Sequence, residues 1–153
     1  MKITDLLQAD RIILELKGGT KQAVLQELAE SAASHCRIAD PREVLNIILA
    51  REKIASTAIG DGVAIPHGKM AGVNGVLAVF GRSTRGVDFQ SPDGERAHLI
   101  FFLVAPEDAA SDHLKALARI SRLIKNAQLR TRLLASKTEQ EIFNLLQEED
   151  SKL

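Results

Sequence analysis

The residue best suited to covalent chemistry is His67, which stands between Pro66 and Gly68 in a glycine-rich segment. Pro66 has a fixed φ and restricts Ile65 before it, so the backbone beside the imidazole is stiff. Because Gly68 has no side chain, we expect it to let a partner approach one ring nitrogen closely. A hydrogen bond from the other nitrogen to a backbone carbonyl would hold one tautomer and leave the free nitrogen as a nucleophile. The alternative is a loop histidine that serves only backbone hydrogen bonds.

A second histidine, His113, begins a predicted helix that follows an apolar strand. Ligands of open α/β sheets collect beyond the carboxyl ends of strands, and the free N–H groups of a helix start attract anions. His113 can therefore face the same pocket as His67. The competing interpretation is a histidine at the rim of the buried helix face.

Three polar residues before His67 have both ordinary and functional interpretations. Arg51 ends a predicted helix, where a cation suits the helix dipole. Ser56 and Thr57 are typical of a loop, but beside a phosphate their hydroxyls become donors. After the histidine, Lys69 can attract phosphate and Met70 can offer soft contact area to a docking protein, or both can be ordinary exposed loop residues.

Composition excludes several classes of protein. The 153 residues carry 20 basic and 20 acidic side chains, so no global positive field favours nucleic acid or an anionic membrane. Trp and Tyr are absent, which removes the usual stacking platforms for bases. The histidines lack a paired-ligand spacing such as His-Glu-x-x-His, so we predict no metal site and no cofactor.

The single cysteine, Cys36, cannot form an internal disulfide and is interpreted as a packing residue. No secretory signal and no apolar run of membrane-spanning length occurs in the sequence, so we expect a cytoplasmic protein without membrane insertion.

Helical periodicity and caps predict the elements that position these residues. Helices are expected to follow the caps Thr20, Asp40 and Thr138, with two more from Asp112 to 124 and from 128 to 134. The helix from Asp112 is expected to bury Leu114, Leu117, Ile120 and Ile124. Strands are predicted at 11–16, 75–81 and 97–104, with shorter extended pieces near 59, 63–65 and 87–89, and His67 is expected in a loop.

This pattern predicts one layered α/β domain over residues 1–153. We expect a mixed, mostly parallel sheet of about five strands with helices on both faces. The acidic tail from about Glu148 is expected to fray into solvent.

The run from Glu52 to Gly68, above all Ile59-Gly60 followed by Ala64-Ile65-Pro66-His67-Gly68, resembles the phosphorylation-site signature of one protein family. These are the fructose/mannitol-type enzyme IIA components of the bacterial phosphoenolpyruvate-dependent phosphotransferase system. The standalone length and the residues 51–53 and 56–57 are most similar to the nitrogen-related branch, enzyme IIA-Ntr.

The resemblance implies that His67 accepts a phosphoryl group from a phosphohistidine carrier, NPr, which enzyme I-Ntr supplies. It further implies that His113 stabilises the phosphoryl group and that Arg51 binds its oxygens, and it makes regulated targets such as potassium-transport proteins or sensor kinases the expected partners. Two alternatives stay open: a sugar-specific IIA that passes phosphate to a separate IIB, and a non-catalytic anion-binding or protein-interaction module.

Overall fold

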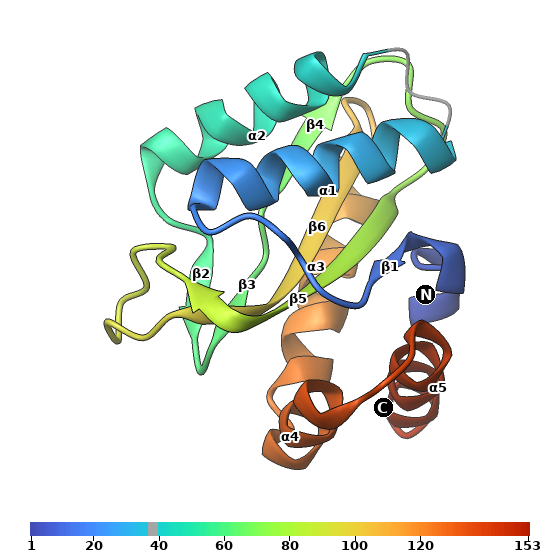
Figure 1. Ribbon diagram of the computed structural model, residues 1–153. Coiled ribbons are helices and arrows are strands. Elements are labelled where there is room, and N and C mark those ends of the chain that lie inside the picture. The colour runs from blue at the N-terminus through green and yellow to red at the C-terminus, as the bar shows by residue number, and fades with distance from the viewer. Residues whose placement is uncertain (37–39) are drawn as a thin grey trace.

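A six-stranded mixed sheet forms the middle of the molecule in a computed structural model that describes residues 1–36 and 40–153 (Figure 1). The side chain of Cys36 lies outside the described part, so its packing role stays a prediction. The strands are β1 Ile12–Ile13, β2 Ala58–Gly60, β3 Val63–Ala64, β4 His67–Met70, β5 Leu77–Val87 and β6 Ala97–Pro106.

The sheet order is β1-β5-β6-β3-β2, and β4 also pairs with β6. Three pairings are parallel, β1 with β5 and both β3 and β4 with β6, whereas β5–β6 and β2–β3 are antiparallel. The prediction of a mixed, mostly parallel sheet is confirmed. The sixth strand is β4, which the sequence indicated only as a loop.

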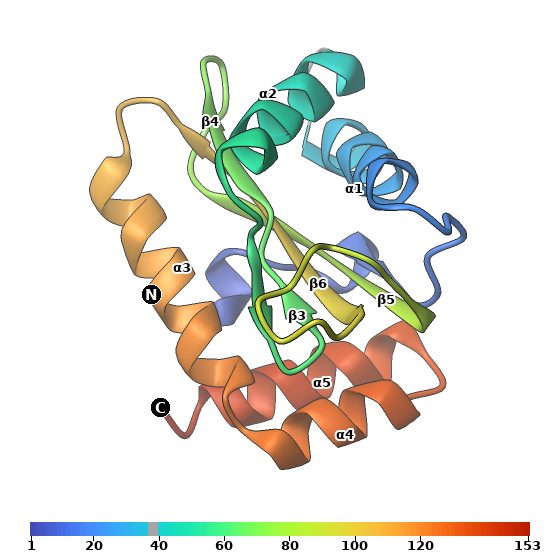
Figure 2. The ribbon, with the colours of Figure 1, turned by 90° about the vertical axis from the view of Figure 1, so that its left-hand side faces the viewer.

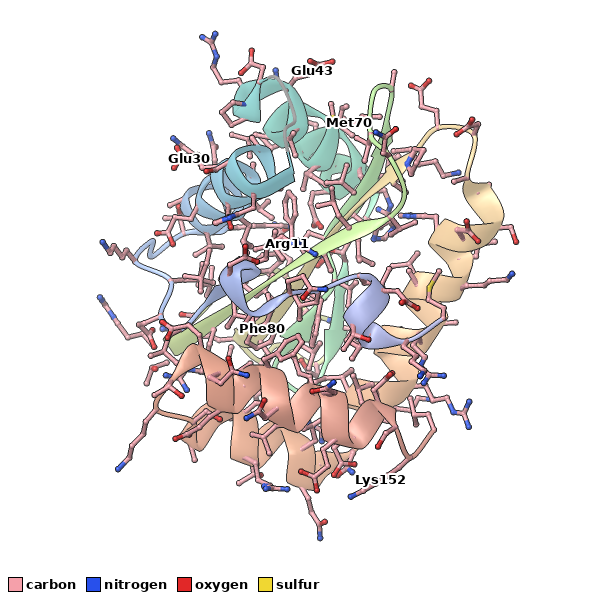
Figure 3. All side chains as sticks on the ribbon, turned by 90° about the vertical axis from the view of Figure 1, so that its right-hand side faces the viewer. Arg11, Glu30, Glu43, Met70, Phe80 and Lys152 are labelled. Atoms are coloured by element: carbon pink, nitrogen blue, oxygen red, sulfur yellow. The ribbon has the colours of Figure 1, made fainter. Side chains whose placement is uncertain are left out.

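The two longest strands carry the core because their apolar side chains are buried on both faces of the sheet. Neighbouring Phe101 and Phe102 on β6 point to opposite faces, as strand alternation requires. Phe101 contacts the edge of Phe80 on β5 at a centroid distance of 4.9 Å. Phe80 is labelled in Figure 3, where it points toward the C-terminal helices.

Helices cover both faces of the sheet, as predicted. One face packs against α1 Lys21–Cys36 and α2 Pro41–Ile54, and the other packs against α3 Ala110–Ile124, α4 Ala127–Ala135 and α5 Glu139–Asp150 (Figure 2). The expected caps are present: Thr20 accepts from the Ala23 N–H, Asp40 from Arg42, and Thr138 from Glu141. Short 3₁₀ turns, Ile3–Asp5 and Ala9–Arg11, precede β1.

The C-terminal tail is more ordered than the sequence suggested, so the expected fraying from Glu148 is wrong for this segment. The helix α5 continues to Asp150, whose buried carboxylate lies 2.6 Å from Arg119 Nε on α3. Asp150 also accepts from the backbone N–H of Ile3 at 3.0 Å. This carboxylate therefore links both ends of the chain to α3.

Within the described residues, no helix is both long and apolar enough to cross a bilayer.

Candidate functional site

His67 opens β4 instead of lying in a loop. Its neighbour Leu103 on β6 donates from its N–H to Pro66 O at 2.9 Å, and parallel pairing continues from His67 to Met70. The sequence did not predict this strand because a four-residue segment that contains a glycine has little strand propensity of its own. Its extended conformation depends on pairing with β6. The sheet edge thus fixes the backbone that carries the imidazole.

The imidazole of His67 is held in one orientation by its own loop. Its Nδ1 lies 2.7 Å from Ile65 O, and a carbonyl oxygen can only accept, so the neutral ring carries its proton on Nδ1. The lone pair then belongs to Nε2. The arrangement is the one expected for a histidine nucleophile, because one nitrogen is committed and the other is available.

Gly68 has a packing role that the sequence did not indicate, and its expected role in letting a partner approach the His67 ring stays a prediction. A Cβ at this position would come within 2.7 Å of a side-chain methyl of Ile47 and 3.3 Å of Ile48, both on α2. The missing side chain therefore permits α2 to pack directly against β4. This close packing brings the last turn of α2, with Arg51, beside His67.

His113 lies against His67, with the ring centroids 5.3 Å apart and the ring planes at 51°. It is 5% exposed, and its Nδ1 is buried without a hydrogen-bond partner in the described part of the chain. Burial in the first place, and then the nearby His67 and Lys69, lowers the pKa of His113 from 6.5 to about 4. His113 is therefore neutral at pH 7, and its ring carries one N–H.

An open groove of about 470 Å³ lies between α2, β4 and α3, which run side by side in Figure 2. Its walls include all three residues that we expected at the centre of the site: His67, His113 and Arg51. The Nη1 of Arg51 donates to Ala55 O at 2.9 Å, so the guanidinium is anchored at the end of its helix with other N–H groups free to bind a ligand.

Apolar side chains border this groove, and the sequence did not indicate them. Ile54 at the end of α2 is 81% exposed, and Leu114 on α3 is 66% exposed. The expectation that Leu114 lies in the core is wrong, because the buried face of α3 runs through His113, Ala116 and Ile120. A helix that buries His113 must turn its next residue about 100° away. Assigning the helix phase from Ala116 instead of Leu117 would have found this.

Ser56 and Thr57 do not line the groove. The Ser56 hydroxyl donates to Phe89 O and accepts from the Ala58 N–H at 3.1 Å. Thr57 is buried and its hydroxyl donates to the carboxylate of Glu52. Their role as phosphate donors stays a prediction, and in this structure both hydroxyls have partners inside the protein.

Lys69 and Met70 lie on opposite faces of β4. Lys69 is exposed and lines the groove on the same side as His67, as strand alternation requires. Met70, labelled in Figure 3, is buried in the core against α1 and α2. The expectation that Met70 offers contact area to a docking protein is therefore corrected: its side chain fills the core, and Lys69 is the exposed member of the pair.

Within the described residues, no three His, Cys, Asp or Glu side chains are grouped so that they could hold a metal ion. The groove brings the imidazoles of His67 and His113 together with the guanidinium of Arg51.

Comparison with known proteins assigns the chain to one family. Residues 5–149 match the family described as phosphoenolpyruvate-dependent sugar phosphotransferase system, EIIA 2. The chain is 44% identical over 146 residues to a nitrogen regulatory protein of Bradyrhizobium diazoefficiens, a match that covers 95% of each protein. It is 39% identical over 150 residues to the fructose-specific EIIABC component of Bacillus subtilis, covering 98% of this chain and 24% of that protein.

The crystal structure of the nitrogen regulatory protein IIA-Ntr from Neisseria meningitidis is similar at a TM-score of 0.88 and 32% identity. The superposition covers 94% of this chain and 98% of that chain. These matches confirm the resemblance that the segment from Glu52 to Gly68 indicated. The chain belongs to the EIIA type-2 family of the phosphoenolpyruvate-dependent sugar phosphotransferase system.

Proposed function

We propose that this EIIA protein is a phosphoryl-accepting regulator of the nitrogen-related branch and that His67 is its phosphorylation site. The observation that carries the proposal is the bond between His67 Nδ1 and Ile65 O, which leaves Nε2 as the nucleophile in a groove with His113 and Arg51. Neutral imidazole needs no further activation to attack phosphorus.

The transfer is an in-line exchange between two histidines. The lone pair of His67 Nε2 forms a new N–P bond while the N–P bond of the donor phosphohistidine breaks, and the donor imidazole leaves with that electron pair. Both sides of the exchange are phosphoramidates, so the reaction is readily reversible. Positioning and charge stabilisation supply most of the catalysis.

Arg51 and His113 would stabilise the phosphoryl oxygens. The guanidinium can contact two oxygens at once through N–H groups not used on Ala55. His113 can donate its single N–H, and a phosphoryl group on His67 would raise the pKa of His113 by placing negative charge beside it. Burial lowers the pKa of His113 and keeps the ring neutral before transfer. After transfer, the negative phosphoryl group partly offsets this lowering of the pKa.

The rim of the groove supports docking of a carrier protein. Ile54 and Leu114 are large apolar residues exposed to solvent, and Lys69 adds positive charge beside them. Such a mixed surface suits a transient partner that carries a phosphate. On the nitrogen-related assignment, the carrier is NPr, supplied by enzyme I-Ntr, and the regulated targets are proteins such as potassium transporters or sensor kinases. The name of the Bradyrhizobium relative supports this branch.

A sugar-specific IIA that passes the phosphoryl group to a IIB is the second candidate, and the fructose-specific EIIABC relative favours it. The two differ in what happens after phosphorylation. Phosphorylated protein mixed with purified IIB domains should keep its phosphate if the protein is a regulator. Rapid loss of phosphate to a IIB would assign it to sugar transport.

Incubation with phosphorylated carrier tests the proposal against the third candidate, a non-catalytic binding module. Wild-type protein should gain acid-labile phosphate, His67→Ala should gain none, and His35→Ala serves as the matched control because His35 lies on α1 outside the groove. Equal labelling of His67→Ala would refute the assignment of His67. Absence of label on the wild type with active carrier would favour the binding module.

A further inference from the structure

Glu52 is a buried carboxylate that directly follows Arg51 in α2. It lies in the last turn of α2 and is 8% exposed. Neither its burial nor its place near a helix C-terminus favours a negative charge. Its partners offset that cost: Lys21 Nζ on α1 lies 2.7 Å away, and the Thr57 N–H and hydroxyl both donate to it.

The network of Glu52 continues to the nucleophile through two further hydrogen bonds. Glu52 holds Thr57 through the backbone N–H and the hydroxyl of Thr57. The backbone carbonyl of Thr57 in turn accepts a hydrogen bond from the Ile65 N–H at 3.0 Å. Ile65 O is the acceptor that holds His67 Nδ1 at 2.7 Å. The Glu52 carboxylate therefore holds Thr57, and Thr57 holds Ile65, whose carbonyl accepts from the His67 imidazole.

We propose that Glu52, clamped by Lys21, is a positioning residue for His67: through Thr57 and Ile65 it holds the carbonyl that selects the reactive tautomer. The proposal rests on the proposed function for its kinetic consequence, but the tautomer itself is a property of the protein without its carrier. It also gives Thr57 a role through the backbone of the site, distinct from contact with phosphate.

Three substitutions isolate the network. Glu52→Gln keeps the shape but removes the negative charge and one of the two acceptor oxygens, so the ion pair with Lys21 is lost. Thr57→Val removes the hydroxyl at nearly constant volume, whereas Thr57→Ser retains it. The matched control is Asp150→Asn, which breaks another buried ion pair, with Arg119, outside the groove.

Two readouts are needed. Nitrogen NMR of the free protein measures the fraction of His67 with its proton on Nδ1, and rapid mixing with phosphorylated carrier measures the rate of acceptance. We expect Glu52→Gln and Thr57→Val to lower the Nδ1–H fraction and to slow acceptance about tenfold, since small misplacement of a nucleophile has large kinetic effects. Thr57→Ser should restore both readouts, and Asp150→Asn should change neither.

Wild-type tautomer and rate in both Glu52→Gln and Thr57→Val would overturn the proposal. An equal effect of Asp150→Asn at matched loss of stability would also overturn it, because general loosening would then suffice. If Glu52→Gln does not fold, the comparison of Thr57→Val with Thr57→Ser decides. If wild-type protein accepts no phosphate, the proposed function fails while the NMR comparison still tests the positioning role.

Discussion

The buried His113 makes the stability of the protein depend on pH in a direction that the structure fixes. Its folded pKa of about 4 lies below the unfolded value of 6.5. Above pH 6.5 the ring is neutral in both states and its burial causes no penalty. Between pH 6.5 and 4 the unfolded chain binds a proton that the folded chain rejects, so the free energy of unfolding falls as the pH falls.

The loss can be estimated from the two pKa values. A pKa difference of one unit corresponds to about 1.4 kcal/mol. Because pH 5 lies about 1.5 units below the unfolded pKa and still above the folded one, the free energy of unfolding falls by about 2 kcal/mol at most. Solvent in the open groove screens part of this effect, which makes about 1 to 2 kcal/mol the expected loss at pH 5.

Urea unfolding of wild type and His113→Leu at pH 7 and pH 5 measures the effect. The variant has no imidazole at this position, so its stability should fall by about 1 to 2 kcal/mol less between the two pH values. The other titrating groups are common to both proteins and cancel in the comparison. The same pH dependence in both proteins would refute the claim that His113 is neutral because it is buried.

Three further changes test other parts of the structure. Gly68→Ala should lower the free energy of unfolding by about 1 to 3 kcal/mol in urea, because its Cβ overlaps Ile47 on α2, and an unchanged midpoint would contradict this packing. Asp150→Asn should cost about 2 to 3 kcal/mol in the same assay by leaving Arg119 without its carboxylate, and a loss below about 0.5 kcal/mol would show that the tail is dispensable. Arg51→Lys should slow phosphoryl acceptance at least tenfold in rapid-mixing assays with little change in stability, and a wild-type rate would exclude two-point contact with phosphate.

Local interactions account for what the sequence predicted well. Thr20, Asp40 and Thr138 cap their helices through bonds within two or three residues, so their signals are complete in the sequence. The apolar runs of β5 and β6 likewise reveal buried strands, although β5 continues to Val87, beyond the predicted end at Gly81. The mixed α/β architecture followed from these elements.

Distant partners account for the errors. β4 becomes a strand because β6 lies beside it, and Asp150 is ordered because Arg119 and Ile3 meet it from far along the chain. The burial of Met70 depends on which face of β4 meets the helices, and a four-residue strand does not show that face in its sequence.

The candidate site divides in the same way. His67 was evident from its setting. Its contact with His113 joins β4 to α3, and the sequence indicated it only indirectly, through the position of His113 at a helix start after a strand and through the resemblance. The apolar rim and the Glu52 network required the structure, because each depends on the phase of a helix against other elements.

The nitrogen that carries the phosphoryl group tests the central claim most directly. Protein labelled with ¹⁵N-histidine and phosphorylated by its carrier can be examined by NMR, in which coupling to phosphorus identifies the bonded nitrogen. Because His67 Nδ1 is committed to Ile65 O, we predict phosphate on Nε2 of His67. Phosphate on Nδ1 of His67, or on any other residue, would contradict the account.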